Sequence, residues 1–568
     1  MKTEFIRSIV KEYFIIIVSV ICALFIIIGI TSVKDDSVTI DEVAHIVSGY
    51  STLTNLNYNL NIEHPPLVKV ISAIPLLFQD IDYKLPGLRM PNQWQEGNKI
   101  LFESGNNIDD ILFWTRFAVL IFHGLLLFVC GVLFKKFLTP TWSLIALFFL
   151  AFEPNIFAHS RYVTTDVGIA LFSVISLLLT AVFMRDPTHK NALYLGLGLG
   201  GVLLTKFSGV LLTLYIFVIL LIFSFITYKY DKEKSKNIFK NTLNTASVAA
   251  FCVYIVYTFF NINTPISQLR SFVNTSLMPA PIKQLELIFS DYTFTKAIPS
   301  YLSGLDYAGN RSIQRSEVTG TQFLDGEYGT MGKGWWYYFP KAWLYKESPA
   351  ILILTLLGAA ILGLSLWKKK KIETALLLML GFSGLYLLLS LLSTLNIGIR
   401  HIAPVLALTP VIGVWIISRW EYAHKYILIG ILILTQCVTI YSTYPFYLSY
   451  FNDFSGGSLN GYKHLSDSNV DWGQNLKRLS VWAEQQGIDA IYVDYWGKTP
   501  LNFYDKKGIL KAWHGDWGRP QGIFAIFPVW IEQSKWVKQR GLTAEDYSYL
   551  DQLPHTTIGN SIFIYDLR

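Results

Sequence analysis

Long apolar runs separated by short polar stretches fill most of the first 444 residues. A helix needs about 20 apolar residues to cross a bilayer, and about eleven runs approach that length. These runs cover residues 13–30, 111–134, 141–157, 166–184, 191–205, 207–227, 243–260, 349–367, 372–394, 402–418 and 426–444. The pattern predicts a mainly α-helical, polytopic membrane protein, because in lipid the backbone must satisfy its own hydrogen bonds.

The chain changes character after residue 444. Strand-like runs, "AIYVDYWG", "GIFAIFPVWI" and "SIFIYDL", follow Gly-rich turns and are separated by a polar stretch with helical character. This pattern predicts a small α/β domain. We therefore expect a transmembrane module over residues 1–444 and a C-terminal domain over residues 445–568.

Composition supports a membrane protein. The chain is 52% hydrophobic and 15% charged, with a mean hydropathy of +0.39, whereas soluble domains are about 25% charged. The net charge of +7 comes mostly from Lys and Arg in short loops, which is an ordinary topology signal, so we expect no nucleic-acid partner. All four cysteines fall in apolar runs, which leaves no disulfide framework or CxxC motif for the loops.

Basic loops orient the spans. Five of them, expected on the cytoplasmic side, lie at residues 135–136, 185–190, 229–240, 368–371 and 419–425. The first run has a basic N-terminal flank and no small-residue cleavage pattern, so we expect a retained signal anchor. An even number of membrane crossings must separate successive cytoplasmic loops. Residues 191–227, which Lys206 interrupts, are therefore expected to form two short helices and not one long helix. The segments 31–110 and 261–348 and the C-terminal domain are therefore expected on the extracytoplasmic side.

One of these outward segments, residues 39–70, is rich in titratable groups. In "TIDEVAH", Thr39 and Glu42 have capping-box spacing, which by itself predicts a helix start. Asp41 and His45, four residues apart, would share one face of that helix, which suits a general base and its partner. One helix start can serve both interpretations.

A second motif, "NIEHPPLVK", adds Glu63, His64 and Lys69. The two prolines alone would explain extended backbone before an interfacial helix that begins near Leu67. Together the three charged or polar side chains could bind a phosphate or a divalent ion. The spacing matches no familiar zinc signature. The sequence therefore identifies no cofactor, and it leaves open whether Glu63 and His64 bind a metal ion.

Further ionisable groups lie at or near the spans. Asp166 begins one span, where a helix cap would explain it. Lys206, Arg400 and His401 are costly at bilayer depth and are expected to face a cavity, a partner or a substrate. Arg116 is expected either to join them or to snorkel toward the membrane surface.

Several cations at one surface indicate an anionic ligand. A sugar linked to a polyprenyl phosphate would satisfy both the cations and the bilayer. Displacement of the phosphate at the anomeric carbon needs a base for the acceptor hydroxyl, and the position of Asp41 suits that role. It also needs positive charge to stabilise the departing phosphate.

The order of the motifs "DE", "EHPPLVK", the Arg of the second span and "HSRYVTTD" resembles the bacterial lipid-carrier-dependent GT-C glycosyltransferases. This group includes protein O-mannosyltransferases and lipid A aminoarabinose transferases. The later "GKGWWYYFPKAWLYKESP" and "YLSYFNDFSGGSLNGYKHLSDSNVDWGQNLKRL" resemble a bacterial subgroup, so the resemblance covers nearly the whole chain. It implies a GT-C-like bundle.

The resemblance also implies roles for individual residues. Asp41 matches the family's catalytic base, with Glu42 completing the motif, and Asp166 matches its second Asp. Glu63 matches an acid of a metal or phosphate site in the aminoarabinose transferases. The chain departs from those enzymes with His64 in place of Lys, and "HPPL" followed by Lys69 is closer to the mannosyltransferases.

Two cationic positions have counterparts as well. Arg116 matches an Arg of the mannosyltransferases, and Arg400 with His401 lies where relatives supply cations to the lipid phosphate.

These observations predict an inverting membrane glycosyltransferase. It would move a sugar from a polyprenyl-phosphate donor to a hydroxyl acceptor, on a protein, lipid or glycan, at the outer face of a bacterial-type plasma membrane. The expected catalytic residues are Asp41, Glu42 and Asp166. The expected donor-binding residues are Glu63, His64, Lys69, Arg116, Lys206, Arg400 and His401.

Two other classes of protein fit part of this pattern. A transporter or flippase of lipid-linked saccharides would also need cations and a path through the bundle, and the interruption at Lys206 favours it. Acids in outward loops and the lack of paired halves argue against it. A structural scaffold would leave the charged clusters unexplained. Asp467 and Asp471, in "DSNVDWGQN", would either contact the acceptor or form a turn and helix cap.

Overall fold

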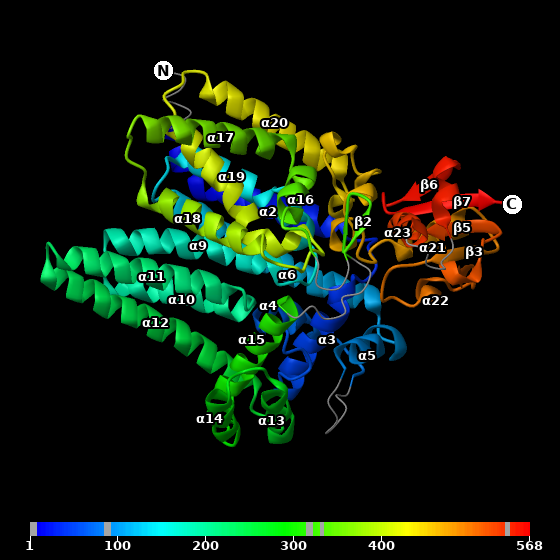
Figure 1. The fold of residues 1–568 in the computed structure, drawn as a ribbon, viewed down its shortest axis with the longest axis horizontal. Helices are drawn as coiled ribbons and strands as arrows, with labels where there is room; N and C mark the ends of the chain where they lie inside the picture. Colours follow the sequence, from blue (N-terminus) through cyan, green and yellow to red (C-terminus); the bar gives the residue numbers. More distant parts are fainter. Residues whose placement is uncertain (1–7, 84–91, 314–321, 330–333, 540–545) are drawn as a thin grey trace.

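The computed structural model describes residues 8–83, 92–313, 322–329, 334–539 and 546–568. Long helices run side by side as a bundle, and a small domain with a β-sheet covers one end (Figure 1). The prediction of a mainly helical, polytopic membrane protein with a C-terminal α/β domain is confirmed.

Eight helices within the described residues are long and apolar enough to cross a membrane. They are α2 (Phe14–Ser32), α6 (Ile108–Phe134), α9 (Asp166–Arg185), α11 (Gly209–Tyr228), α12 (Lys232–Phe260), α17 (Pro349–Trp367), α19 (Ala403–Ser418, counted from Ile399) and α20 (Lys425–Thr443). The bent pair α7 (Pro140–Ala151) and α8 (Pro154–Ser160), with 62° between its halves, would make nine. Helices α10 (His189–Thr205) and α18 (Thr374–Ser390) are shorter. Each expected run thus contains a helix, and eleven crossings remain a prediction.

The interruption at Lys206 is a break between two helices, as expected from parity. Helix α10 ends at Thr205, Lys206 is extended, and α11 begins at Gly209. A Cβ on Gly209 would lie 2.4 Å from Val202 Cγ1 and 2.8 Å from the Val202 carbonyl oxygen. Glycine therefore permits the close approach of the two helix ends.

One predicted boundary is wrong. Residues 229–240 were expected to be a loop, but α12 already begins at Lys232 and continues through the charged stretch. Asp231 caps this helix by accepting a 2.9 Å hydrogen bond from the Lys234 backbone N–H. Lys and Glu are good helix formers, so the charged turns extend the apolar helix instead of ending it.

The segments between spans carry shorter elements. The first contains α3 (Ile40–Asn55), α4 (Leu67–Ala73), η1 (Ile74–Phe78), α5 (Gln93–Asn98) and η2 (Lys99–Glu103). The second contains α13 (Ile266–Thr275), α14 (Ala280–Ser290), α15 (Ala297–Ile313), β1 (Phe323–Leu324), β2 (Glu327–Tyr328) and α16 (Tyr338–Lys346). The predicted helix start near Leu67 is confirmed. Helices α3, α4 and α5 lie at the end of the bundle nearest the C-terminal domain (Figure 1).

The C-terminal domain contains a five-stranded sheet in the order β4-β3-β5-β7-β6. Its strands are β3 (Ile491–Asp494), β4 (Leu510–Ala512), β5 (Gly522–Ile526), β6 (His555–Ile558) and β7 (Ile562–Leu567). Strand β3 pairs in parallel with β4 and β5, and β7 is antiparallel to β5 and β6. Its helices are α21 (Leu476–Gln485), α22 (Leu501–Tyr504) and α23 (Pro528–Gln539).

All three predicted strand runs contain a strand, while β4 and β6 were not predicted. The end of "GIFAIFPVWI" begins α23 instead of extending β5, because Pro528 fits the first turn of a helix and lacks the N–H that a central strand needs.

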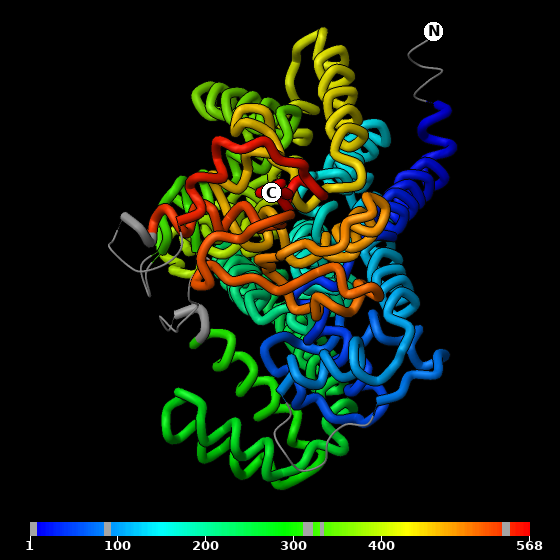
Figure 2. The backbone as a smooth tube through the Cα atoms, turned by 90° about the vertical axis from the view of Figure 1, so that its right-hand side faces the viewer, coloured from blue at the N-terminus to red at the C-terminus, as the bar shows by residue number. Residues whose placement is uncertain are grey.

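Short turns connect the last span to this domain. They are η4 (Tyr447–Ser449), η5 (Asp453–Ser455), η6 (Gly461–Lys463) and η7 (Asp467–Asn469), all after α20. Two further short turns, η8 (Gly515–Trp517) and η9 (Tyr547–Gln552), lie within the domain, and η3 (Ile399–Ile402) lies just before α19. The domain, in orange and red, covers the end of the bundle in Figure 2.

The two ends of the chain are joined by backbone contacts. The Ser37 N–H donates to the Gln474 carbonyl at 2.8 Å, and the Ile40 N–H donates to the Trp472 carbonyl at 2.9 Å. Asp36 forms an ion pair with Arg478. The start of α3 is therefore anchored on the segment that leads into the C-terminal domain.

Candidate functional site

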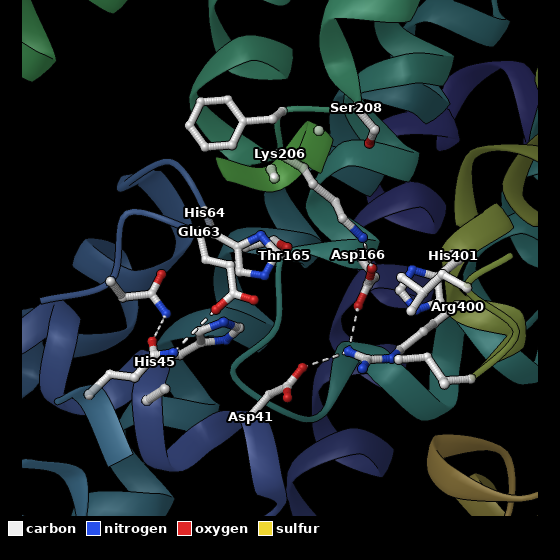
Figure 3. Close-up of a pocket in the computed structure, with 18 of the residues that line it drawn as sticks. Asp41, His45, Glu63, His64, Thr165, Asp166, Lys206, Ser208, Arg400 and His401 are labelled. Atoms are coloured by element: carbon white, nitrogen blue, oxygen red, sulfur yellow. Dashed lines mark hydrogen bonds and ion pairs between the residues drawn. The ribbon is translucent and has the colours of Figure 1, made fainter. Parts of the chain in front are cut away.

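A cavity of about 340 Å³ with several charged side chains opens among α3, the break between α10 and α11, the start of α9, α15 and η3. The predicted residues that line it are Asp41, Glu63, His64, Asp166, Lys206, Arg400 and His401. Figure 3 shows these side chains pointing toward one another from elements far apart in the sequence.

The start of α3 presents Asp41 to the cavity. The backbone N–H and the hydroxyl of Thr39 both donate to Glu42 Oε2, at 2.9 and 3.0 Å, which confirms the capping box. Asp41 lies in the first turn and His45 one turn later on the same face, so both line the cavity.

Opposite charges alternate along one wall of the cavity. Arg400 Nη1 donates to Asp41 Oδ2 at 2.7 Å and to Asp166 Oδ2 at 3.4 Å (Figure 3). Lys206 Nζ donates to Asp166 Oδ1 at 2.5 Å. The Asp41 side chain is 22% exposed and that of Asp166 only 3%. Asp166 is thus enclosed by two cations, while Asp41 remains accessible.

The segment after the last span holds Arg400 in place. Arg400 Nε donates to Ser468 Oγ at 3.1 Å, and the guanidinium lies 4.1 Å from the centre of the Trp472 ring. Asn469 Oδ1 accepts from the Ile399 N–H at 2.9 Å. Because these contacts fix both the side chain and its backbone, Arg400 is preorganised toward the two acids.

Asp41 is held ionised. Burial disfavours its charge, but the charge of Arg400 and the hydrogen bond from Arg400 outweigh this, and they lower its pKa below the ordinary value. Burial lowers the pKa of His45, and burial with the nearby charge of Lys206 lowers the pKa of His64 well below the usual range. At neutral pH the cavity therefore pairs a carboxylate with neutral imidazoles.

Two of the imidazoles have ring nitrogens that find no hydrogen-bond partner within the described part of the chain. These are Nδ1 of His64 and Nε2 of His401, and both are buried. His45 is different, since its Nδ1 lies 2.7 Å from the Val163 carbonyl oxygen. A carbonyl only accepts, so Nδ1 carries the proton of neutral His45. Buried polar atoms are usually satisfied, so the atoms on His64 and His401 suit a bound polar ligand.

A chain of amide and carboxylate groups lines the opposite wall. Asn61 donates to Gln93, and Gln93 Nε2 donates to Glu63 Oε2 at 3.2 Å. Trp94 lines the same wall. This combination of amides, a carboxylate and an aromatic ring can hydrogen-bond hydroxyl groups and pack against an apolar face.

Lys69 does not line the cavity. It is buried, and its Nζ donates to the Asn61 carbonyl at 2.7 Å, to Asn61 Oδ1 at 2.9 Å and to the His64 carbonyl at 2.6 Å. The sequence predicted that Lys69 binds the sugar donor, but three local hydrogen-bond acceptors already engage its ammonium group. Lys69 instead fixes the loop that carries Glu63 and His64.

Glu42 and Arg116 also lie outside the cavity. Arg116 donates through Nε to Glu42 Oε1 at 2.9 Å and through Nη2 to Oε2 at 2.7 Å, and both side chains are buried. It also donates to the carbonyls of Val33, Asp36 and Ser37. The expected direct contacts with substrate and lipid phosphate do not fit this geometry, and neither does snorkelling. The pair fixes the start of α3.

Asp467 and Asp471 border a small separate cavity with Trp496 and Trp530. Asp471 accepts from the Gly473 N–H at 2.6 Å and from the Ser561 hydroxyl, which fits the turn interpretation. Across the described ranges, no group of three or more His, Cys, Asp or Glu side chains is arranged to hold a metal ion.

Several cavity residues were missed by sequence reasoning. These are Asn61, Gln93, Trp94, Thr165 and Ser208 on the walls, with Ser468 and Trp472 behind Arg400. Their residue types are common in loops. Asn61, Thr165, Ser468 and Trp472 stand inside the motifs quoted above, but only the folded chain shows that they belong to this site. Gln93, Trp94 and Ser208 lie in no such motif, so no local signal marks them.

The fold and the cavity define a multi-pass membrane protein with a charged site at one end of its helical bundle. Residues 57–266 match the family model described as dolichyl-phosphate-mannose-protein mannosyltransferase. This match confirms the resemblance to the GT-C glycosyltransferases, and the matched family is one of glycosyltransferases. Among functionally curated proteins, none matches the sequence.

Solved structures show distant likenesses. ArnT from Cupriavidus metallidurans bound to undecaprenyl phosphate has 11% identity and a TM-score of 0.44, covering 97% of both chains. AglB from Archaeoglobus fulgidus in complex with an inhibitory peptide and a dolichol-phosphate has 11% identity and a TM-score of 0.46, covering 93% of this chain and 71% of that one. The Saccharomyces cerevisiae Pmt1-Pmt2 complex bound to its sugar donor has 16% identity and a TM-score of 0.32, covering 43% and 33%. At these scores the likenesses assign neither fold nor function.

Proposed function

We propose that this protein transfers a sugar from a polyprenyl-phosphate donor to a hydroxyl acceptor, with inversion at the anomeric carbon. The observation that carries the proposal is the accessible, ionised Asp41 held 2.7 Å from Arg400 in a cavity that Lys206 and His401 also line. A base and cations for a leaving phosphate thus lie within one small space. The family-model match supports the donor class through the name of that family.

In the proposed reaction Asp41 accepts the proton of the acceptor hydroxyl. The hydroxyl oxygen forms a bond to the anomeric carbon as the bond from that carbon to the phosphate oxygen breaks. The bonding electrons leave with the phosphate, so the products are the glycosylated acceptor and polyprenyl phosphate. Attack from the face opposite the phosphate gives inversion.

The cations favour the transition state over the bound donor. The phosphodiester of the donor carries one negative charge, and the departing phosphate gains a second as the bond breaks. Arg400 and Lys206 are held in place by Asp166, so their positive charge is oriented before the reaction. Charge that develops during the reaction is therefore stabilised with little reorganisation.

The opposite wall would hold the sugar. The amide and carboxylate groups of Asn61, Gln93 and Glu63 can hydrogen-bond sugar hydroxyls, and the unpartnered Nδ1 of His64 offers a further contact. Trp94 suits the apolar face of a pyranose ring. Glu63 and His64 thus serve donor binding in this proposal.

We place the cavity on the extracytoplasmic side of a bacterial-type plasma membrane. The basic turns at residues 135–136, 185–190 and 368–371 lie between spans and support this orientation by the positive-inside rule. The acceptor, a hydroxyl on a protein, lipid or glycan, would reach the cavity from the same side as the C-terminal domain.

The test is a transfer assay with the purified full chain in liposomes. A panel of polyprenyl-phosphate sugars is supplied with hydroxyl acceptors, and release of free polyprenyl phosphate is followed. The wild type is expected to release it from one donor. Asp41→Asn is expected to lose about a thousandfold or more in rate, since it removes the base while keeping the size of the side chain. Asp35→Asn, an exposed acid six positions earlier, serves as the control and should match the wild type.

Two results would contradict the proposal. Near-wild-type transfer by Asp41→Asn would remove Asp41 as the base. Movement of the lipid-linked sugar between leaflets without release of polyprenyl phosphate would identify a flippase, the alternative that the break at Lys206 favours.

A further inference from the structure

A second cavity, of about 290 Å³, lies where α17, α18 and α19 meet near the turn at residues 368–373. Its walls are of two kinds. One side is basic and includes Lys368, Lys371 and Arg419, and the other is apolar and includes Leu362, Ile372 and Leu376. Neither the proposed transfer reaction nor the family match uses this cavity.

The two cavities lie at opposite ends of one transmembrane helix. Arg400 and His401, just before α19, line the first cavity, and Trp415 and Ile416, near its end, line the second. The span Ile399–Ser418 has 20 residues, which at about 1.5 Å per residue is about the thickness of the hydrocarbon core. The second cavity therefore lies at the opposite membrane surface.

The lining carries a net positive charge. Four cations, Lys368, Lys370, Lys371 and Arg419, face two acids, Glu373 and Glu421. Arg419 is held by Glu373 at 2.6 Å, whereas the pair of Lys370 with Glu421, at 3.2 Å, is exposed and contributes little. Two positive charges remain in excess at the mouth of a cavity that is partly apolar.

Trp415 supplies an independent sign of a ligand. It is fully buried and lines the cavity, yet its indole N–H has no hydrogen-bond partner within the described part of the chain. Buried donors are seldom left unsatisfied, and a phosphate or glycerol oxygen would accept from this one. The rings of Trp420 and Tyr422, which also line the cavity, are stacked with their centres 4.6 Å apart. Trp and Tyr are common at membrane–water interfaces.

We propose that this cavity binds the headgroup of an anionic phospholipid. Lys368 and Lys371 neutralise the phosphate, the Trp415 N–H donates to a headgroup oxygen, and the beginning of an acyl chain lies on Leu362, Ile372 and Leu376. A basic pocket between helices, with an apolar wall open to the bilayer, matches a lipid better than a free anion, which would gain nothing from the apolar wall.

The test is native mass spectrometry of the purified full chain titrated with phosphatidylglycerol, cardiolipin, phosphatidylcholine or inorganic phosphate. The wild type is expected to bind the two anionic lipids and to prefer them over phosphatidylcholine. Lys368→Gln/Lys371→Gln is expected to weaken that binding by about tenfold or more, because each basic side chain near an anionic headgroup contributes to affinity. Lys232→Gln/Lys234→Gln removes two exposed cations at the start of α12 and should keep wild-type affinity.

Trp415→Phe provides a second variant that keeps every charge. It removes the indole donor and should weaken anionic-lipid binding while thermal unfolding shows a folded protein. Equal binding of phosphatidylcholine and phosphatidylglycerol by the wild type, or full retention of selectivity in both variants, would overturn the proposal. Binding of inorganic phosphate without binding of the lipids would also overturn it.

Discussion

Nη1 of Arg400 lies 2.7 Å from Oδ2 of Asp41, although 359 residues separate the two in the sequence. The contact keeps Asp41 ionised and places a fixed cation beside the proposed base. Because Arg400 also contacts Asp166, one guanidinium links the acid that would accept the proton to the acid that orients Lys206.

Arg400→Lys should lower kcat about ten- to a hundredfold. The variant keeps the charge but loses the planar fork that reaches Asp41, Asp166 and Ser468 at once. Steady-state transfer kinetics measure the effect, and the KM of the donor should change less than kcat. Arg270→Lys is the control, because Arg270 makes an exposed pair with Asp291. A wild-type kcat for Arg400→Lys would show that its geometry is not needed.

Arg116→Met should destabilise the protein by about 3 kcal/mol or more, since it leaves Glu42 buried without its cation. Glu42→Gln/Arg116→Met removes both charges, so it should be more stable than Arg116→Met alone. Thermal unfolding in detergent compares the variants. If the double variant is destabilised by the sum of the two single effects, the buried pair is not coupled as described.

Gly209→Ala should reduce both transfer and thermal stability. The added Cβ would meet the Val202 side chain and carbonyl, so the ends of α10 and α11 would move apart and displace Lys206 from Asp166. Gly363→Ala is the matched control, because a Cβ there has no neighbour within 4 Å among the described residues. Equal activity of the two variants would argue against a role for the helix break.

Asp471 should make stability depend on pH. Burial raises its pKa from 3.8 to about 7, so between these values the folded protein holds a proton that the unfolded chain has lost. The stabilisation is complete below about pH 4 and disappears as pH rises through 7, a change of at most about 4 kcal/mol.

Asp471→Asn stays neutral and should unfold at a higher temperature than the wild type at pH 8, with the gap closing toward pH 4. Unfolding scans across this range measure it, with the exposed Asp453→Asn as the control. A gap that does not vary with pH would contradict the assignment.

The sequence predicted the bundle well because hydrophobic length and basic loops are local signals. The break at Lys206 followed from parity, and the helix start at Asp41 followed from the spacing of Thr39 and Glu42. The sequence could not separate Lys69 and Arg116 from Lys206 and Arg400. All four are cations near one surface. Only tertiary contacts show that Lys206 and Arg400 line the cavity, whereas Lys69 and Arg116 donate hydrogen bonds to buried acceptors.

Sequence reasoning also missed the two amide side chains on the wall of the cavity that carries Glu63. Asn61 and Gln93 belong to separate loop and helix segments, and their hydrogen bond exists only in the folded chain. Asn61 opens the motif "NIEHPPLVK", but nothing in the sequence marks Gln93 as its partner.

The contacts that join residues 36–40 to residues 472–478 have a consequence for biosynthesis. The proposed base enters the membrane with the first helices, but the cation beside it and the segment that holds that cation are made hundreds of residues later. Closing such distant contacts is slow and comes last in folding. The protein should therefore pass through insertion as an inert helical bundle and become active only after residues 468–478 have been made and have docked against the start of α3.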